Sequence, residues 1–568
     1  MMKYMTDKTI NFFHSKKWPL IVLLSIFFLC FQILLIIHYG LAKPNLFMDE
    51  YWSYNLANSY YRPFLGNFHS AEYYNHWLTA QDWIAGLSVS PDHMFSYNTV
   101  IFNQSMDVHP PLFYFLLHTI CSFFPGQFSR WFCLAPNIIF FILTQIGVFL
   151  SAKQVLKNDW LAFCSCVLYG FTWGAINTAV FLRMYMMLTF ISIISFYVHL
   201  KFIKTIELEK NYYKLLVAIY FASLAGVMTQ YYFLIFQFFL SCSILLYLFH
   251  KNKKKVIIHY SLVMAGMLAS CVGLFPSILK QIAGKAGNQG IAFIGGYIKE
   301  PFFDRVHACC HAINVDLFGG KWFIAIIAVF FVVRLIFAAF HIEFIRSDHE
   351  LTVTWAKGNI PIPRSIQLKL TTIYKFLTVF LCTGYFLVVS KVAPYLEPRY
   401  FYIIYPILVI LFVDVLQYIV IGNKSNKIKL YCFLLIWFVG IGINVHQYAH
   451  DRVHFAAPSF AKVAERVADD KLNVIEINNN ESWWPIFPQY KLFKNAPFSY
   501  LSTDSNLSRV IDALETMPGK QDAVLIIKSN DSKIKDEDLL QFLVKNTEYK
   551  HYDKLYSYFG NIYYFSKP

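Results

Sequence analysis

Long apolar runs constrain this chain more than any other feature of its sequence. A helix needs about 20 mainly apolar residues to cross a bilayer. Only 15% of the 568 residues are charged and 57% are hydrophobic, whereas a soluble domain carries about 25% charged residues. The sequence predicts a mainly α, polytopic transmembrane bundle of about eleven spans, at residues 18–39, 130–152, 160–180, 184–203, 213–229, 231–249, 256–280, 321–343, 368–390, 400–421 and 429–446.

The positive charges indicate how these spans are oriented. The net charge is +15, and the lysines gather in short clusters between apolar runs, near 153–157, 201–214, 251–255, 346–369 and 424–429. Such clusters are typical of cytoplasmic turns. The basic lead at 1–17 then places the N-terminus in the cytoplasm. The first run reads as a retained anchor, because it is longer than a signal peptide and no small-residue cleavage site follows it.

The same pattern argues against a nucleic-acid partner, since no soluble module interleaves basic residues with stacking aromatics. The partner it predicts is the lipid bilayer of the cell membrane.

Two outer segments and a C-terminal region are too large to be connectors. Segments 40–108 and 281–320 lie outside by the charge alternation. The apolar stretch 109–126 is bounded by proline pairs or Pro-Gly, and we expect a juxtamembrane helix there because a further span would put a lysine cluster outside.

The composition divides the chain into a transmembrane domain at 1–446 and a small extracytoplasmic α/β domain at 447–568. In the second domain the pattern predicts helices near 459–470, 508–517 and 536–545. It predicts strands near 472–477 and 523–527 and a terminal strand pair. No nucleotide or zinc-protease motif occurs in it. A structural cap or an acceptor-docking module is the simplest interpretation.

Two acidic motifs lie in the first outer segment. Asp49 and Glu50 follow the first span, and carboxylates near a membrane are functional candidates by default, although both could simply cap the next helix. Asp107 and His109 precede Pro110-Pro111, and a proline pair fixes where a helix begins. This motif should present both side chains at the outer face, unless it is only a capped surface helix.

Two basic motifs lie at the outer ends of later spans. Arg183 and Tyr185 stand at the junction of two spans, where an arginine needs an anion such as a carboxylate or a lipid phosphate. Lys391 and Arg399, with Tyr400, bracket a short outer turn and would suit a phosphate. The alternative for both motifs is an ordinary anchor to lipid headgroups.

In content and order these motifs resemble the GT-C superfamily of membrane glycosyltransferases. The nearest relatives look like bacterial members related to protein O-mannosyltransferases and lipid A aminoarabinose transferases. The resemblance covers about residues 15–450. It rests on Asp49-Glu50, His109-Pro110-Pro111-Leu112, Arg183-Met184-Tyr185 and Pro398-Arg399-Tyr400, with the outer turn Thr229-Gln230-Tyr231-Tyr232 beside them.

The resemblance implies a glycosyltransferase that uses a polyprenyl-phosphate-linked sugar, a hexosyl donor, and an extracytoplasmic acceptor of unknown identity. Asp49 would be the general base, with Glu50 and His109 supporting it, and Asp107 could supply the second carboxylate that some relatives place before the R-x-Y element. Arg183, Lys391 and Arg399 would neutralise the departing phosphate, with Tyr185 and Tyr400 in the binding site. No cofactor and no metal is expected.

Other interpretations remain open. A transporter or flippase of lipid-linked glycans would show inverted repeats and midplane polar groups. A glycan polymerase would lack the acidic pair, and a docking protein would not need Asp49. His307 and His311 have the spacing of a zinc pair, which is weak by itself. Arg334 and Asp414 lie within apolar runs, and we expect them to pair with each other.

Overall fold

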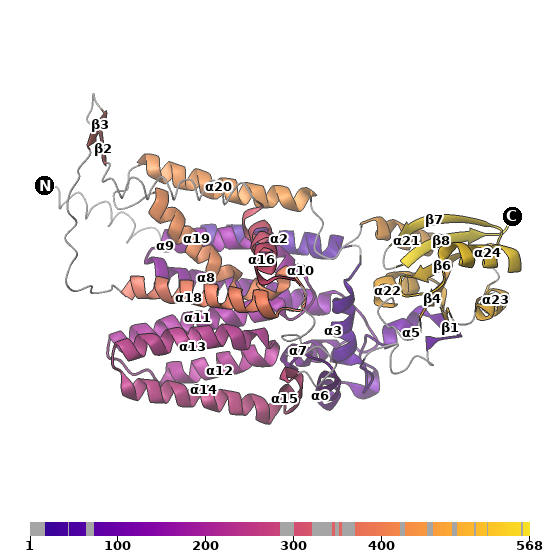
Figure 1. Ribbon diagram of the computed structural model, residues 1–568, viewed down its shortest axis with the longest axis horizontal. Coiled ribbons are helices and arrows are strands. Elements are labelled where there is room, and N and C mark those ends of the chain that lie inside the picture. The colour runs from indigo at the N-terminus through magenta and orange to yellow at the C-terminus, as the bar shows by residue number, and fades with distance from the viewer. Residues whose placement is uncertain are drawn as a thin grey trace.

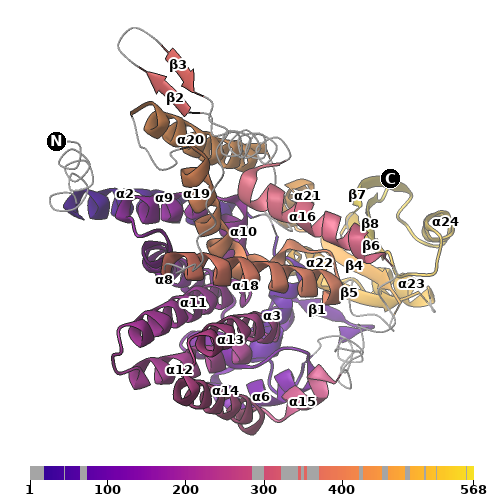
Figure 2. The ribbon, with the colours of Figure 1, turned by 60° about the vertical axis from the view of Figure 1, so that its left-hand side comes forward.

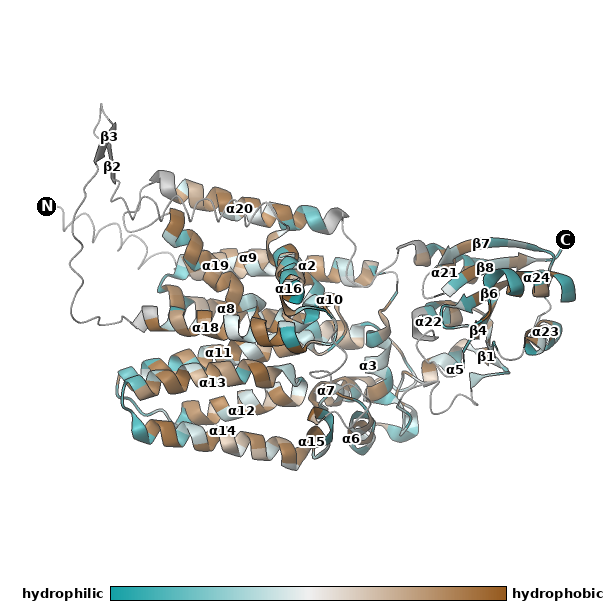
Figure 3. Cartoon of the chain, in the orientation of Figure 1, coloured by the Kyte–Doolittle hydropathy of each residue, from teal (hydrophilic) through white to brown (hydrophobic). Residues whose placement is uncertain are grey.

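The structure is a bundle of long helices with a mixed β-sheet domain at one end (Figure 1). This is a computed structural model, and the residues it describes are 18–43, 45–63, 73–283, 300–320, 343–346, 351–354, 370–420, 427–450, 458–479, 486–504, 507–519, 521–557 and 560–568. Apolar residues dominate the bundle, whereas the sheet domain mixes polar and apolar residues (Figure 3). The chain is therefore a mainly helical, multi-pass membrane protein.

Eight helices in the described part of the chain are long and apolar enough to cross a bilayer. They are α2 (Trp18–Ala42), α8 (Trp131–Leu156), α11 (Tyr185–Glu207), α13 (Tyr232–His250), α14 (Lys254–Leu274), α18 (Leu370–Val392), α19 (Tyr405–Val420), which follows η4 (Tyr402–Ile404), and α20 (Lys427–His450). A ninth span is a broken one, because α9 (Asp159–Gly170) and α10 (Trp173–Val180) are bent by 59°.

Eleven spans were expected, and the described residues contain eight, or nine with the broken span. The span expected at 213–229 is α12 (Tyr213–Thr229), which is apolar but only 17 residues long. The span expected at 321–343 falls almost entirely outside the described residues. The span expected at 256–280 ends early, at Leu274, and a separate short helix, α15 (Ser277–Ile282), follows it. Pro276 explains the break, because proline lacks the N–H that a continuing helix would need.

Within the described residues, the intramembrane Asp414 has a lysine as its ion-pair partner, and its expected pairing with Arg334 stays a prediction. Asp414 on α19 pairs with Lys375 on α18 at 2.7 Å, and Arg334 lies outside the described residues. The lysine on α18 neutralises the charge of the aspartate. The sequence did not indicate this ion pair, because Lys375 lies within an apolar run.

The first outer segment forms small elements at the end of the bundle nearest the sheet domain (Figure 2). They are α3 (Met48–Asn58), β1 (Trp77–Thr79), α5 (Ala80–Ala85), η1 (Pro91–His93), α6 (Tyr97–Met106) and α7 (Leu112–Ser122). Helix α7 has 11 residues, too few to cross a bilayer, as its bounding prolines predicted. Asn103 ties α6 to the end of α3 by donating to the carbonyl of Ser59 at 2.8 Å.

The C-terminal domain is one six-stranded sheet, in the order β1-β5-β4-β6-β8-β7. Its strands are β4 (Asn473–Asn478), β5 (Phe498–Thr503), β6 (Ala523–Ser529), β7 (His551–Ser557) and β8 (Gly560–Ser566), with helices α21 (Pro458–Asp469), α22 (Ile486–Asn495), α23 (Ser508–Glu515) and α24 (Asp536–Asn546). Strands β5, β4 and β6 run parallel, and the outer strands are antiparallel. The expected elements are present; α22 and β5 are additional.

The sheet is completed by a strand from the first outer segment. Strand β1 pairs with β5, Trp77 opposite Tyr500. Trp83 on α5 is fully buried. Its ring stacks on Phe493 at 4.6 Å, and its Nε1 donates to Ser499 at 2.7 Å. These contacts fasten the sheet domain to the first outer segment. The expected domain division at residue 446 remains a proposal.

A Trp83→Ala substitution should loosen that fastening. Removing a fully buried tryptophan costs about 3–5 kcal/mol, and the hydroxyl of Ser499 would lose its donor. We expect faster proteolysis of the C-terminal domain and a lower Tm. Trp131→Ala, at a position 40% exposed, is the control, and equal proteolysis of both variants would contradict the prediction.

The remaining described elements lie around the bundle. A two-stranded hairpin joins β2 (Glu343–Arg346) and β3 (Leu351–Thr354). Helix α16 (Phe302–Phe318) packs against α10 and α18, and η3 (Pro398–Tyr400) forms the turn after α18. That turn brings a predicted basic motif to the end of the bundle.

Candidate active site

Asp49 and two arginines meet at the end of the bundle that faces the sheet domain. Asp49 lies in the first turn of α3, where a carboxylate complements the helix dipole. Arg399 on η3 forms a close ion pair with Asp49 Oδ2. Arg183 Nη1, from the turn between α10 and α11, lies 3.9 Å from the same oxygen and donates to the Asp49 backbone carbonyl at 2.7 Å. Residues 350 positions apart thus share one charge cluster.

The second acidic motif joins this cluster through His109. The His109 Nδ1 atom lies 2.7 Å from Asp107 Oδ2, and its Nε2 lies 3.4 Å from Arg183 Nη2. Because an arginine can only donate, we assign the ring proton to Nδ1, where it is donated to Asp107. The contacts then run from Asp107 through His109 and Arg183 to Asp49.

Two residues outside the motifs hold the cluster in place. Gln281 on α15 donates from one amide nitrogen to the carbonyls of Gln104 and Asp107, each at 2.7 Å. Arg305 on α16 is fully buried and donates to the carbonyl of Ser390 at 2.8 Å and to that of Ala393. Gln281 thus positions the turn that contains Asp107, and Arg305 anchors the start of the turn that carries Arg399.

The charges around Asp49 keep it ionised. Burial alone would raise the pKa of Asp49, but the charges of Arg183 and Arg399 outweigh burial and hold that pKa below its usual range. Both guanidinium groups also keep a spare donor, since the Nε atoms of Arg183 and Arg399 are buried and have no hydrogen-bond partner among the described residues. The cluster therefore has donors available for an anion.

Glu50 lies beside Asp49 in the sequence but points elsewhere. Its carboxylate is fully buried and pairs with Lys43 at 2.5 Å. It also accepts from the backbone N–H of Phe47 at 2.5 Å and from that of Leu182 at 2.8 Å. Glu50 thus ties α3 to the turn that carries Arg183. Its expected part in catalysis stays a prediction.

The remaining predicted site residues are Tyr185, Tyr400 and Lys391. Tyr185 and Tyr400 are buried near the cluster, and Arg399 lies over the Tyr400 ring at 5.5 Å. Lys391 is exposed in the last turn of α18 and joins none of the ion pairs found among the described residues. Its phosphate-binding role remains a prediction without a contact to support it.

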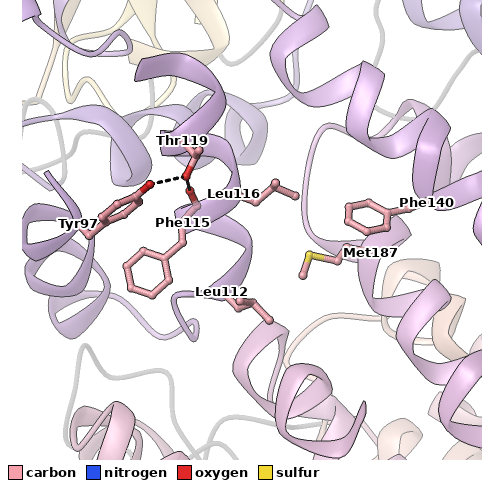
Figure 4. Close-up of a pocket in the computed structure, with 7 residues that line it drawn as sticks. All are labelled: Tyr97, Leu112, Phe115, Leu116, Thr119, Phe140 and Met187. Carbon is pink, nitrogen blue, oxygen red and sulfur yellow. Dashed lines mark hydrogen bonds between the residues drawn. The ribbon is translucent and has the colours of Figure 1, made fainter. Parts of the chain in front are cut away.

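An apolar cavity of about 520 Å³ lies between two helices of the first outer segment and two spans (Figure 4). It is lined by residues of α6, α7, α8 and α11, namely Tyr97, Leu112, Phe115, Leu116, Thr119, Phe140 and Met187. Its polar lining is a hydroxyl pair, Tyr97 with Thr119 at 2.9 Å. Leu112 follows the His109-Pro110-Pro111 entry, and Met187 lies two residues after Tyr185, so α7 and α11, which line this cavity, also lie next to these two motifs in the sequence.

The possible zinc pair gains no further ligand. His307 and His311 lie on α16, and the described residues contain no group of three or more His, Cys, Asp or Glu side chains arranged for a metal ion.

Comparison with known proteins gives structural matches only. No protein-family model and no curated protein sequence matches the chain. The crystal structure of ArnT from Cupriavidus metallidurans bound to undecaprenyl phosphate is similar over 94% of this chain and 97% of that one, with 9% identity and a TM-score of 0.43. The same protein in the apo state matches over 86% and 93%, with 11% identity and a TM-score of 0.46.

ArnT is a lipid A aminoarabinose transferase, a GT-C membrane glycosyltransferase of the type that the four motifs resemble. The match extends over nearly the whole chain. Both TM-scores are below 0.5, so this likeness by itself assigns no function to the chain.

Three supporting residues escaped prediction from the sequence. Lys43 ends the first apolar run and reads as a snorkelling anchor, although a lysine seven residues before Glu50 could have been noticed as its partner. Gln281 and Arg305 carry no motif, and their roles depend on backbone carbonyls that only the folded chain brings to them.

Proposed function

We propose that this protein is a membrane glycosyltransferase that moves a sugar, a hexose or a close derivative, from a polyprenyl-phosphate carrier to an extracytoplasmic acceptor. The observation that carries this proposal is the convergence of Arg183 and Arg399 on Asp49. It places a carboxylate that can accept a proton beside fixed cations that can hold a phosphate. Neither guanidinium has used all its donors.

The proposed step is a substitution at the anomeric carbon of the donor. The acceptor hydroxyl or amine forms the new bond to that carbon, its proton passes to Asp49, and the bond to the phosphate oxygen breaks with its electron pair. Arg183 and Arg399 stabilise the negative charge that grows on the departing phosphate. His109, held by Asp107, keeps Arg183 oriented.

The apolar cavity between α6, α7, α8 and α11 supports a lipid donor. Its walls are almost entirely carbon and sulfur, and it lies between the juxtamembrane helices and the spans α8 and α11. An isoprenoid chain could leave the bilayer there while its phosphate reaches Arg183 and Arg399. The lysine-rich turn after α13 lies at the other end of the bundle (Figure 3), which supports an extracytoplasmic site.

The pH dependence of transfer should report the ionisation of Asp49. Because Arg399 lowers the pKa of Asp49, activity should persist as the pH falls through the ordinary carboxyl range. In an Arg399→Gln variant the pKa of Asp49 rises, so the acidic limb of kcat/KM should move to higher pH. Residual activity measured from pH 4 to 8 tests this, and an unmoved limb would contradict the role of Asp49 as base.

The function is tested by transfer with purified protein. We expect transfer from polyprenyl-phosphate-linked hexoses to membrane acceptors, with release of polyprenyl phosphate, and none from diphosphate-linked oligosaccharides. Transfer from the diphosphate donors alone would favour a polymerase. Movement of labelled donor across vesicles without a new glycosidic bond would favour a flippase. Either result would overturn the proposal.

A further inference from the structure

A second acidic cluster lies in the sheet domain, far from the motifs used above. Glu476 and Asn478 lie on β4, Ser529 ends β6, and Asp531 follows it. Glu476 pairs in register with Ile527, so Ser529, two residues further on, lies on the same face. In parallel sheets, ligands bind outside the carboxyl ends of the strands, and this cluster lies at that edge.

The polar atoms of this cluster are buried and lack partners. Glu476 is fully buried, and neither its carboxylate oxygens nor those of Asp531 have a hydrogen-bond partner among the described residues. The same holds for Asn478 Nδ2 and Ser529 Oγ, whose side chains are also fully buried. Buried polar groups normally have partners, and an unpaired buried carboxylate is especially costly.

A residue of the first outer segment closes the cluster. The Tyr74 hydroxyl donates to Asn478 Oδ1 at 2.8 Å. Burial and the nearby charges of Glu476 and Asp531 raise the pKa of Tyr74. Burial and the neighbouring Asp531 raise the pKa of Glu476 to about 8.

We propose that Glu476, Asp531 and Ser529 form a binding site for a divalent cation of the calcium type, with Asn478 holding Tyr74 beside it. The available ligand atoms are carboxylate and hydroxyl oxygens, which hard cations prefer. Zinc and other soft ions would want histidine or cysteine, and the cluster has neither. Binding would give the unpartnered oxygens of both carboxylates a counter-ion. Through Asn478 and Tyr74 it would also strengthen the attachment of the domain to the first outer segment.

The full-length protein in detergent, stripped with a chelator, allows a direct test. CaCl₂ should raise its Tm by about 3 °C or more, as expected for a ligand near 100 times its Kd. Glu476→Gln should abolish the calcium shift, because the amide cannot supply a negatively charged oxygen to the ion. Asp531→Asn should also abolish it, whereas Glu515→Gln, an exposed position on α23, should keep it.

Two results would overturn the proposal. One is a wild-type Tm that neither CaCl₂ nor MgCl₂ raises; the other is a calcium shift that survives in Glu476→Gln. If the variants do not fold, Tb³⁺ emission excited through tyrosine in the wild-type protein, and its displacement by CaCl₂, decides the matter. Absence of such emission would also overturn it.

Discussion

An Asp49→Asn variant is expected to lose about 10²–10⁴-fold in sugar transfer while the protein remains folded. Asparagine keeps the size of the side chain but cannot accept the acceptor's proton. It also no longer balances Arg399 and Arg183, which meet at Asp49 Oδ2. The loss should fall on kcat, because the two arginines can still bind the donor phosphate. Initial rates with a polyprenyl-phosphate-linked hexose, at several donor concentrations, measure this.

The matched control is Asp92→Asn, an exposed carboxyl in η1 of the same outer segment. This control should keep wild-type activity. If Asp49→Asn transferred sugar at the wild-type rate, Asp49 would not be the base. If it lost only affinity for the donor, Asp49 would organise the arginines without taking part in proton transfer.

A Glu50→Gln variant is expected to lose stability, by about 3–5 kcal/mol, because one member of a buried ion pair is removed. Lys43 and Glu50 are both almost completely buried and lie 2.5 Å apart. Burial already lowers the pKa of Lys43, and Glu50 opposes that effect, so the lysine would be left with an uncompensated charge. A fall in Tm and in the yield of folded protein should be the main consequence.

A double variant separates loss of the pair from loss of one partner. Lys43→Met with Glu50→Gln should recover much of the lost Tm, since an apolar side chain can replace the buried charge. A Glu50→Gln protein with unchanged Tm but no transfer activity would contradict the structural role and would indicate that Glu50 takes part in catalysis.

That the basic and acidic motifs lie close together was predictable, because each follows or precedes a span on the same side of the membrane. The charge alternation put residues 49, 183 and 399 on one side, and helices fixed by a bilayer can bring only neighbouring ends together. Contacts that depend on distance in space rather than on membrane side were not predictable. The partner of Asp414 is one example, since apolar periodicity does not reveal which of several buried charges is nearest.

The division of labour between Asp49 and Glu50 also could not be read from the sequence. Adjacent residues in a helix point in directions about 100° apart, and only the folded chain shows that one faces Arg399 and the other Lys43. Strand β1 is similar: three residues carry no period, and their pairing with β5 is set by a partner more than 400 positions away.

Binding of a polyprenyl phosphate, compared with the same polyprenol, tests the central claim most directly, because it requires no knowledge of the sugar or acceptor. Charge-assisted hydrogen bonds contribute about 1.5–3 kcal/mol each, so the wild-type protein should bind the phosphate at least about tenfold more tightly than the alcohol. An Arg183→Gln, Arg399→Gln double variant should bind both alike. Equal affinity of the wild-type protein for the phosphate and the alcohol would contradict the proposal that these arginines hold a phosphate.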